Sequence, residues 1–133
     1  MFSGKYFLTV CAIALSTTFI QWFFIGFLFH KYQALTPSTW RKENNRSYAA
    51  SMIISLFFAF LFTTIILIWK ERTGDMHFFN GIEFGAVCWL AFSITTEIGN
   101  AVYVNYSPMF VFGKCLSSLL EYTVAGILAV ALL

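Results

Sequence analysis

Two long stretches of this sequence contain no charged residue. They run from Tyr6 to Phe29 and from Ser47 to Trp69, and each is longer than the roughly 20 residues that an α-helix needs to cross the hydrocarbon core of a bilayer. Inside that core every backbone N–H and C=O group must find a partner within the protein, so a single apolar segment can cross only as a helix. The two stretches therefore predict two transmembrane helices.

The second half of the chain predicts two more. It is apolar on both sides of the turn-forming cluster Asn105-Tyr106-Ser107-Pro108. The composition agrees, because 59% of the residues are hydrophobic and only 11% are charged, against about 25% in soluble domains. We expect an all-α polytopic membrane protein, a bundle of four transmembrane helices within one domain, 1–133. The expected spans are residues 6–29, 47–69, 81–104 and 109–133.

The first span begins like a signal peptide, because Lys5 precedes an apolar run. That run continues to Phe29, which is too long for the hydrophobic part of a signal peptide. We expect an uncleaved helix. In the connection that follows, Thr36-Pro37 fits a helix N-cap followed by proline at the first helical position, and so predicts a short surface helix before the second span.

The distribution of basic residues predicts an orientation. Those near the connection between the first two spans are Lys31, Arg41, Lys42 and Arg46, and those on the opposite side are Lys5, Lys70 and Arg72. Because basic loops tend to remain in the cytoplasm, we expect this connection to be cytoplasmic and both termini to lie on the far side of the membrane.

Charged residues within the predicted spans need an explanation. A charge at the bilayer centre costs about 3 kcal/mol on insertion scales, so such residues usually face the interior of a bundle and find partners. Glu97 lies nine residues before Tyr106 and Lys114 eight residues after it. In an antiparallel hairpin both therefore lie at a similar depth, roughly 10 Å into the membrane. The sequence predicts an ion pair between them.

Other polar residues share faces with this pair. Lys114, Ser117, Ser118 and Glu121 lie on one face of the fourth helix, Asn100 lies on the face of Glu97, and Gln21 has a similar depth on the first helix. The candidate ligand- or proton-binding residues are thus Gln21, Glu97, Asn100, Lys114 and Glu121. Burial favours the neutral form of a carboxyl group. Because Glu121 is deeper and two turns from the lysine, we expect it to be the protonated one at neutral pH.

Small residues predict close helix contacts. Ser51, Ser55, Ala59 and Thr63 recur every four residues along the second span, and Gly81 and Gly85 begin the third. Such stripes let another helix approach closely, either within the chain or from another copy in a homo-oligomer.

Several classes of function are not supported. The net charge of +2 and the lack of a nucleic-acid module argue against nucleic acid as a partner. Cys11, Cys88 and Cys115 have no C-x-x-C spacing and are expected to serve in packing. His30 and His77 are expected at opposite surfaces, so no metal site is predicted. No nucleophile or phosphate-binding motif is present. We expect no catalytic residues and no cofactor, and an enzyme is disfavoured without being excluded.

Short motifs along the chain carry a resemblance to a family. They are Trp22, Gly26, Phe29, Thr36-Pro37, Gly81-Ile82, Gly85, Trp89-Leu90, Asn100 and Gly126. In these the chain resembles a family of small bacterial four-helix integral membrane proteins catalogued as a domain of unknown function. The resemblance implies four helices and a bacterial inner membrane, with no catalytic residues to transfer.

Two functions remain open. The leading hypothesis is small-molecule binding or proton-linked transport through an intramembrane polar pocket, with the lipid bilayer and an unknown small molecule as partners. The alternative is an accessory or structural membrane subunit in which the same polar residues only hydrogen-bond helices together.

Overall fold

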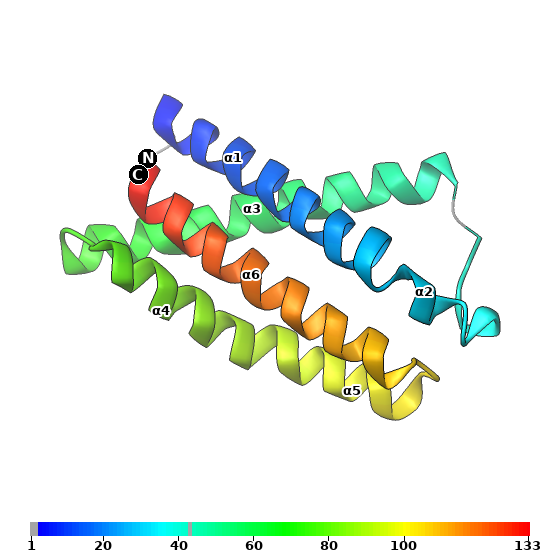
Figure 1. Cartoon of the computed structure of the whole chain (residues 1–133). Coiled ribbons are helices and arrows are strands. Elements are labelled where there is room, and N and C mark those ends of the chain that lie inside the picture. Colours follow the sequence, from blue (N-terminus) through cyan, green and yellow to red (C-terminus); the bar gives the residue numbers. More distant parts are fainter. Residues whose placement is uncertain (1–2, 43) are drawn as a thin grey trace.

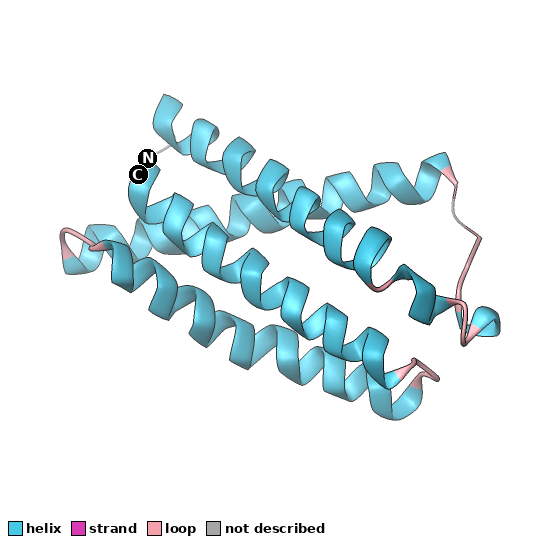
Figure 2. Ribbon diagram, viewed as in Figure 1, coloured by secondary structure: helices cyan, strands magenta, loops and turns pink. Residues whose placement is uncertain are grey.

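The computed structural model describes residues 3–42 and 44–133, and this part of the chain contains helices and loops but no strand (Figure 1, Figure 2). The first half comprises α1 (Gly4–Gln21), the π-helical η1 (Trp22–Leu28), α2 (His30–Gln33), the 3-10 turn η2 (Pro37–Thr39) and α3 (Asn45–Thr73). The second half comprises α4 (Phe78–Cys88), the π-helical η3 (Trp89–Ile94), α5 (Thr95–Tyr103) and α6 (Pro108–Leu132).

Four continuous helices in this part of the chain are long and apolar enough to cross a membrane. They are Gly4–Leu28, Asn45–Thr73, Phe78–Tyr103 and Pro108–Leu132. The prediction of an all-α bundle with four transmembrane helices is confirmed, and the chain is a multi-pass membrane protein by the length and composition of its helices.

Local residue choices set where the long helices begin and end. The side chain of Asn44 accepts a hydrogen bond from the Ser47 backbone N–H at 3.0 Å, and the Ser47 hydroxyl accepts one from the Asn44 N–H at 3.0 Å, which caps α3. The helix ends at Gly74, whose φ of +88° few other residues adopt. Pro108 begins α6, where its missing N–H costs no helical hydrogen bond.

The connection between α1 and α3 differs in detail from the expected surface helix. Only one 3-10 turn, Pro37–Thr39, forms after Thr36. The Thr36 hydroxyl does not cap it, because it accepts a hydrogen bond from the Trp40 indole at 3.3 Å. Trp40 then packs edge-to-face on Phe110 at 4.7 Å between ring centroids, so aromatic packing against α6 organises the connection.

Glycine brings α4 and α6 into backbone contact. A Cβ atom on Gly81 would lie 2.5 Å from the Gly126 carbonyl oxygen, and one on Gly85 would collide with the Tyr122 carbonyl. Both glycines of α4 are buried. The close contact expected of Gly81 and Gly85 is therefore confirmed, and its partner lies within the same chain.

The helix α3 packs on the bundle along only half its length. Ala59, Phe62, Thr63 and Ile66 are buried, whereas the residues before Ser55 are exposed. The Tyr6 hydroxyl of α1 lies 2.7 Å from the Thr64 hydroxyl and donates to the Phe60 carbonyl at 3.1 Å, which ties α1 to this half. Figure 1 shows α3 crossing the other helices, with its first half diverging from them.

Substituting Gly85 by alanine should destabilise the bundle by about 1 to 3 kcal/mol, because the new methyl group has no space beside α6. Gly99→Ala is the matched control, since nothing lies within 4 Å of a Cβ atom there. Alanine favours a helix more than glycine does, so the control should be neutral or stabilising. Thermal unfolding in detergent measures both. Equal melting temperatures for the two variants would rule out the proposed contact.

The predicted orientation is also testable. Figure 1 places both termini and the α3–α4 loop at one end, and the α1–α3 connection at the other. In a variant lacking the three native cysteines, Asp75→Cys should react with a membrane-impermeant maleimide outside intact cells. Asn45→Cys should react only after the membrane is opened, because the basic connection is expected in the cytoplasm. If Asn45→Cys reacts outside intact cells and Asp75→Cys does not, the predicted orientation is wrong.

Candidate functional site

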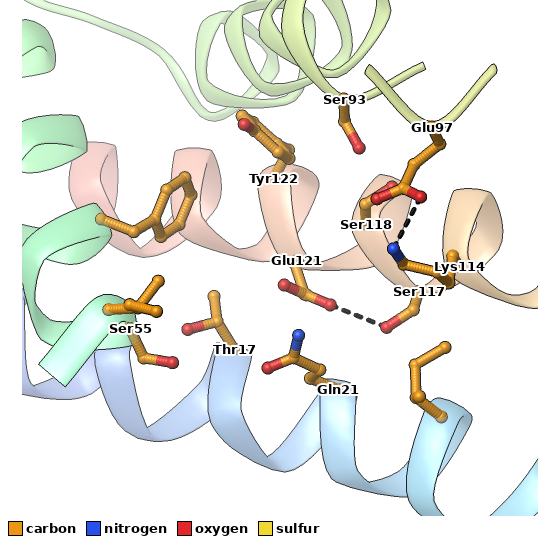
Figure 3. A pocket seen from close by; sticks show the side chains of 13 residues that line it. Thr17, Gln21, Ser55, Ser93, Glu97, Lys114, Ser117, Ser118, Glu121 and Tyr122 are labelled. Atoms are coloured by element: carbon orange, nitrogen blue, oxygen red, sulfur yellow. Dashed lines mark hydrogen bonds and ion pairs between the residues drawn. The ribbon is translucent and has the colours of Figure 1, made fainter. Parts of the chain in front are cut away.

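A polar cavity of about 340 Å³ lies within the membrane-spanning part of the bundle (Figure 3). All four long helices contribute to its wall. Its charged and amide side chains are Gln21, Glu97, Lys114 and Glu121, and its hydroxyl groups come from Thr17, Ser55, Ser93, Ser117, Ser118 and Tyr122. Polar side chains from all four spans thus converge on one space.

An ion pair closes one side of the cavity. Lys114 Nζ lies 2.7 Å from Glu97 Oε2, and the two side chains have exposed fractions of 27% and 15%. The ammonium group also lies 5.6 Å from the centroid of the Tyr106 ring, within range of a cation–π interaction. The pair predicted from equal depth in the hairpin is confirmed, and it joins α5 to α6.

Glu121 has a different environment. Its Oε1 accepts a hydrogen bond of 2.7 Å from the Ser117 hydroxyl, one turn earlier on the same helix. Figure 3 shows its carboxyl group directed toward Thr17 and Gln21 of α1. The Thr17 hydroxyl donates to the Ile13 carbonyl of its own helix at 2.9 Å. The hydrogen bond of Glu121 therefore stays within α6 and does not link two helices.

Two π-helical segments contribute to the wall. The segment η1 follows Gln21 directly and supplies Ile25, and η3 supplies Ser93. A π-helical turn adds a residue to the helical repeat, which shifts the side chains that follow it around the helix axis, and such turns are frequent at functional sites. The segments η1 and η3 therefore change which side of the helix is occupied by the residues that follow Gln21 and Trp89.

A tryptophan holds the second of these segments against α6. Trp89 Nε1 donates to the Cys115 carbonyl at 3.0 Å and to the Ser118 hydroxyl at 3.1 Å. The sequence gives a signal for this contact, because the N–H of a tryptophan in the middle of a span needs an acceptor from a neighbouring helix. It gives none for the π-helical geometry or for the position of Ser93.

The structure brings four of the five candidate residues together. Gln21, Glu97, Lys114 and Glu121 all line the cavity. Asn100 lies one turn beyond Glu97 on α5, is exposed and is not part of the cavity wall. Tyr122 and Ser93 complete the wall although sequence reasoning did not select them.

Metal ligands are not clustered in the described residues, where no group of three or more His, Cys, Asp or Glu side chains could hold an ion. The three cysteines are free. Cys11 is exposed on α1, and Cys88 and Cys115 are half-buried.

The comparison with known families matches nearly all of this fold. A family model described as a protein of unknown function, DUF1761, matches residues 8–130. The chain belongs to the DUF1761 family. The resemblance inferred from the short motifs is thereby confirmed, and the cavity, from Thr17 to Tyr122, lies wholly within the DUF1761 match. No curated protein and no solved structure matches the chain.

Removing one partner of the ion pair should destabilise the protein more than removing both partners. Glu97→Gln and Lys114→Met should each destabilise the protein, by up to about 3 kcal/mol, because each leaves a charge without its partner at membrane depth. The loss of stability in the double variant should be smaller than the sum of the losses in the two single variants. Thermal unfolding of the wild type and the three variants in detergent measures this double-mutant cycle. Additive losses would show that the pair contributes no coupling energy.

Proposed function

We propose that this protein binds a small molecule in the polar cavity, and that Glu121 couples binding or transport to protons. The observation that carries the proposal is the difference between the two glutamates of the cavity. Glu97 is committed to an ion pair that joins two helices, whereas the carboxyl group of Glu121 accepts a hydrogen bond from a serine of its own helix and faces the cavity. A polar residue at membrane depth that does not join helices needs another role.

The size and lining of the cavity agree with this proposal. A volume of about 340 Å³ falls at the lower end of the range for ligand pockets. Its wall combines hydroxyl groups with apolar side chains such as Ile25 and Ile54, a mixture that can hold and orient a small ligand. In this proposal Gln21 and the serine hydroxyls orient the ligand, and Lys114 with Glu97 forms a fixed wall.

A second candidate function is supported by different contacts. The Glu97–Lys114 pair and the Trp89 hydrogen bonds both cross between helices, as expected of a structural or accessory subunit whose polar residues hold the bundle together. The exposed apolar first half of α3 offers a surface for another copy of the chain or another membrane protein. This candidate leaves Glu121 and Gln21 without a role.

We further propose that the protein resides in a bacterial inner membrane. The support is the membership in the DUF1761 family and the resemblance to small bacterial membrane proteins, together with four helices of spanning length.

The role of Glu121 can be tested by infrared spectroscopy. Titrating the purified protein should show a carboxyl stretching band that responds reversibly to pH, and this band should be absent from Glu121→Gln. Glu83→Gln is the control, because Glu83 is exposed at the start of the third span and lies outside the cavity. The infrared spectrum of Glu83→Gln should retain the carboxyl band of Glu121.

The same variant also separates the two candidate functions by stability. Glutamine retains the shape and hydrogen-bonding capacity of a neutral acid, so Glu121→Gln should unfold within about 1 kcal/mol of the wild type if the residue serves binding. A loss of several kcal/mol, with no titrating band assigned to Glu121, would favour the structural subunit.

A further inference from the structure

The charges of the cavity are not balanced. Lys114 is matched by Glu97 at 2.7 Å, and the Tyr106 ring lies against the same ammonium group. No salt bridge of the described residues includes Glu121, whose carboxyl group has the Ser117 hydroxyl as its hydrogen-bond partner. When Glu121 is ionised, the cavity therefore carries one negative charge that no side chain in the described part of the chain neutralises by direct contact.

Two aromatic side chains line the same cavity as Glu121. Phe58 of α3 and Tyr122 of α6 both line the cavity, and their rings meet edge-to-face at 5.2 Å between centroids. Tyr122 follows Glu121 on α6, and Phe58 packs on the Tyr122 ring from α3. A cavity that holds both a carboxylate and aromatic rings favours organic cations, because the ring quadrupoles and the carboxylate attract the same positive charge.

We propose that the cavity binds a small organic monocation, a quaternary or protonated amine, with its charge against Glu121 and its carbon groups against Phe58 and Tyr122. This inference rests on the proposed function and names the ligand class of the same site. The volume of about 340 Å³ restricts the cation to a small one. The Gln21 amide and the Thr17 hydroxyl border the same space and can accept hydrogen bonds from an amine.

An anionic ligand fits the cavity less well than a cation. An anion would have to take Lys114 away from Glu97, leaving that carboxylate exposed to a second negative charge at membrane depth. A bare metal ion would need several oxygen ligands around it. Among the described residues, no group of three or more His, Cys, Asp or Glu side chains could hold such an ion.

Protons should compete with the cation for Glu121. The other titratable groups that line the cavity are Glu97 on α5 and Lys114 and Tyr122 on α6. The wall residues of α1, η1, α3 and η3 do not titrate in the accessible pH range. Glu97 is held by Lys114, so protonation of Glu121 is the event expected to release the ligand, and binding should weaken as the pH falls.

Three probes of nearly the same shape test the role of charge. They are choline, the neutral 3,3-dimethylbutan-1-ol and the anionic 3,3-dimethylbutyrate, titrated calorimetrically into the purified protein in a neutral detergent at alkaline pH, where Glu121 is ionised. We expect choline to bind at least about tenfold more tightly than either of the others. Lowering the pH should weaken choline binding and leave the alcohol unchanged. Glu121→Gln should remove the preference for choline, whereas the control Glu83→Gln should keep it.

The outcomes separate this inference from the proposed function. The inference is overturned if the alcohol or the acid binds as tightly as choline, if choline binds equally well to Glu121→Gln, or if none of the three probes binds. A titrating carboxyl band of Glu121 in the same preparation would then leave the proposed function standing with a ligand of another class. Absence of both the band and any binding would remove the two proposals together.

Discussion

Charged and polar groups have no water to hydrogen-bond in the hydrocarbon core of a bilayer, and the structure of this protein depends on that constraint. It requires the four spans to be helical, since only a helix satisfies its own backbone within one segment. It also requires Glu97 and Lys114 to find each other, which they do at 2.7 Å across the hairpin of α5 and α6. The position of this pair then defines one wall of the polar cavity.

Close packing at the other end of the same hairpin holds α4 against α6. Gly81 and Gly85 let α4 contact the backbone of α6 near Gly126 and Tyr122, and Trp89 fixes the next segment by donating to the Cys115 carbonyl. Meanwhile α3 packs through its second half and diverges through its first. The bundle is thus tightly held near the termini, whereas α3 separates from it toward the α1–α3 connection, and the cavity lies where α3 begins to separate.

The polar residues of the cavity divide into two groups by what they contact. Glu97, Lys114 and Trp89 make contacts between helices and contribute to holding the fold together. Glu121 and Gln21 face the cavity, and the hydrogen bond of Glu121 remains within its own helix. Membership in the DUF1761 family assigns no activity to either group. The division is therefore the physical basis for proposing that ligand binding centres on Glu121.

The sequence alone determined the four spans, the hairpin at Asn105-Tyr106-Ser107-Pro108 and the Glu97–Lys114 pair. Each follows from a one-dimensional rule, because span length, helical rise and distance from a turn can all be counted along the chain. The same counting placed Gln21 at the depth of this pair and Glu121 deeper in the membrane, and both line the cavity.

Only the tertiary structure decided how the helices face one another. Asn100 shares a face with Glu97 in an ideal helix, yet it lies outside the cavity, while Ser93 and Tyr122 lie within its wall. The π-helical segments Trp22–Leu28 and Trp89–Ile94 shift the faces of two helices, and α3 lines the cavity where it diverges from the bundle. These features depend on side-chain packing between segments far apart in the chain, and no local sequence pattern encodes the rotation of one helix against another.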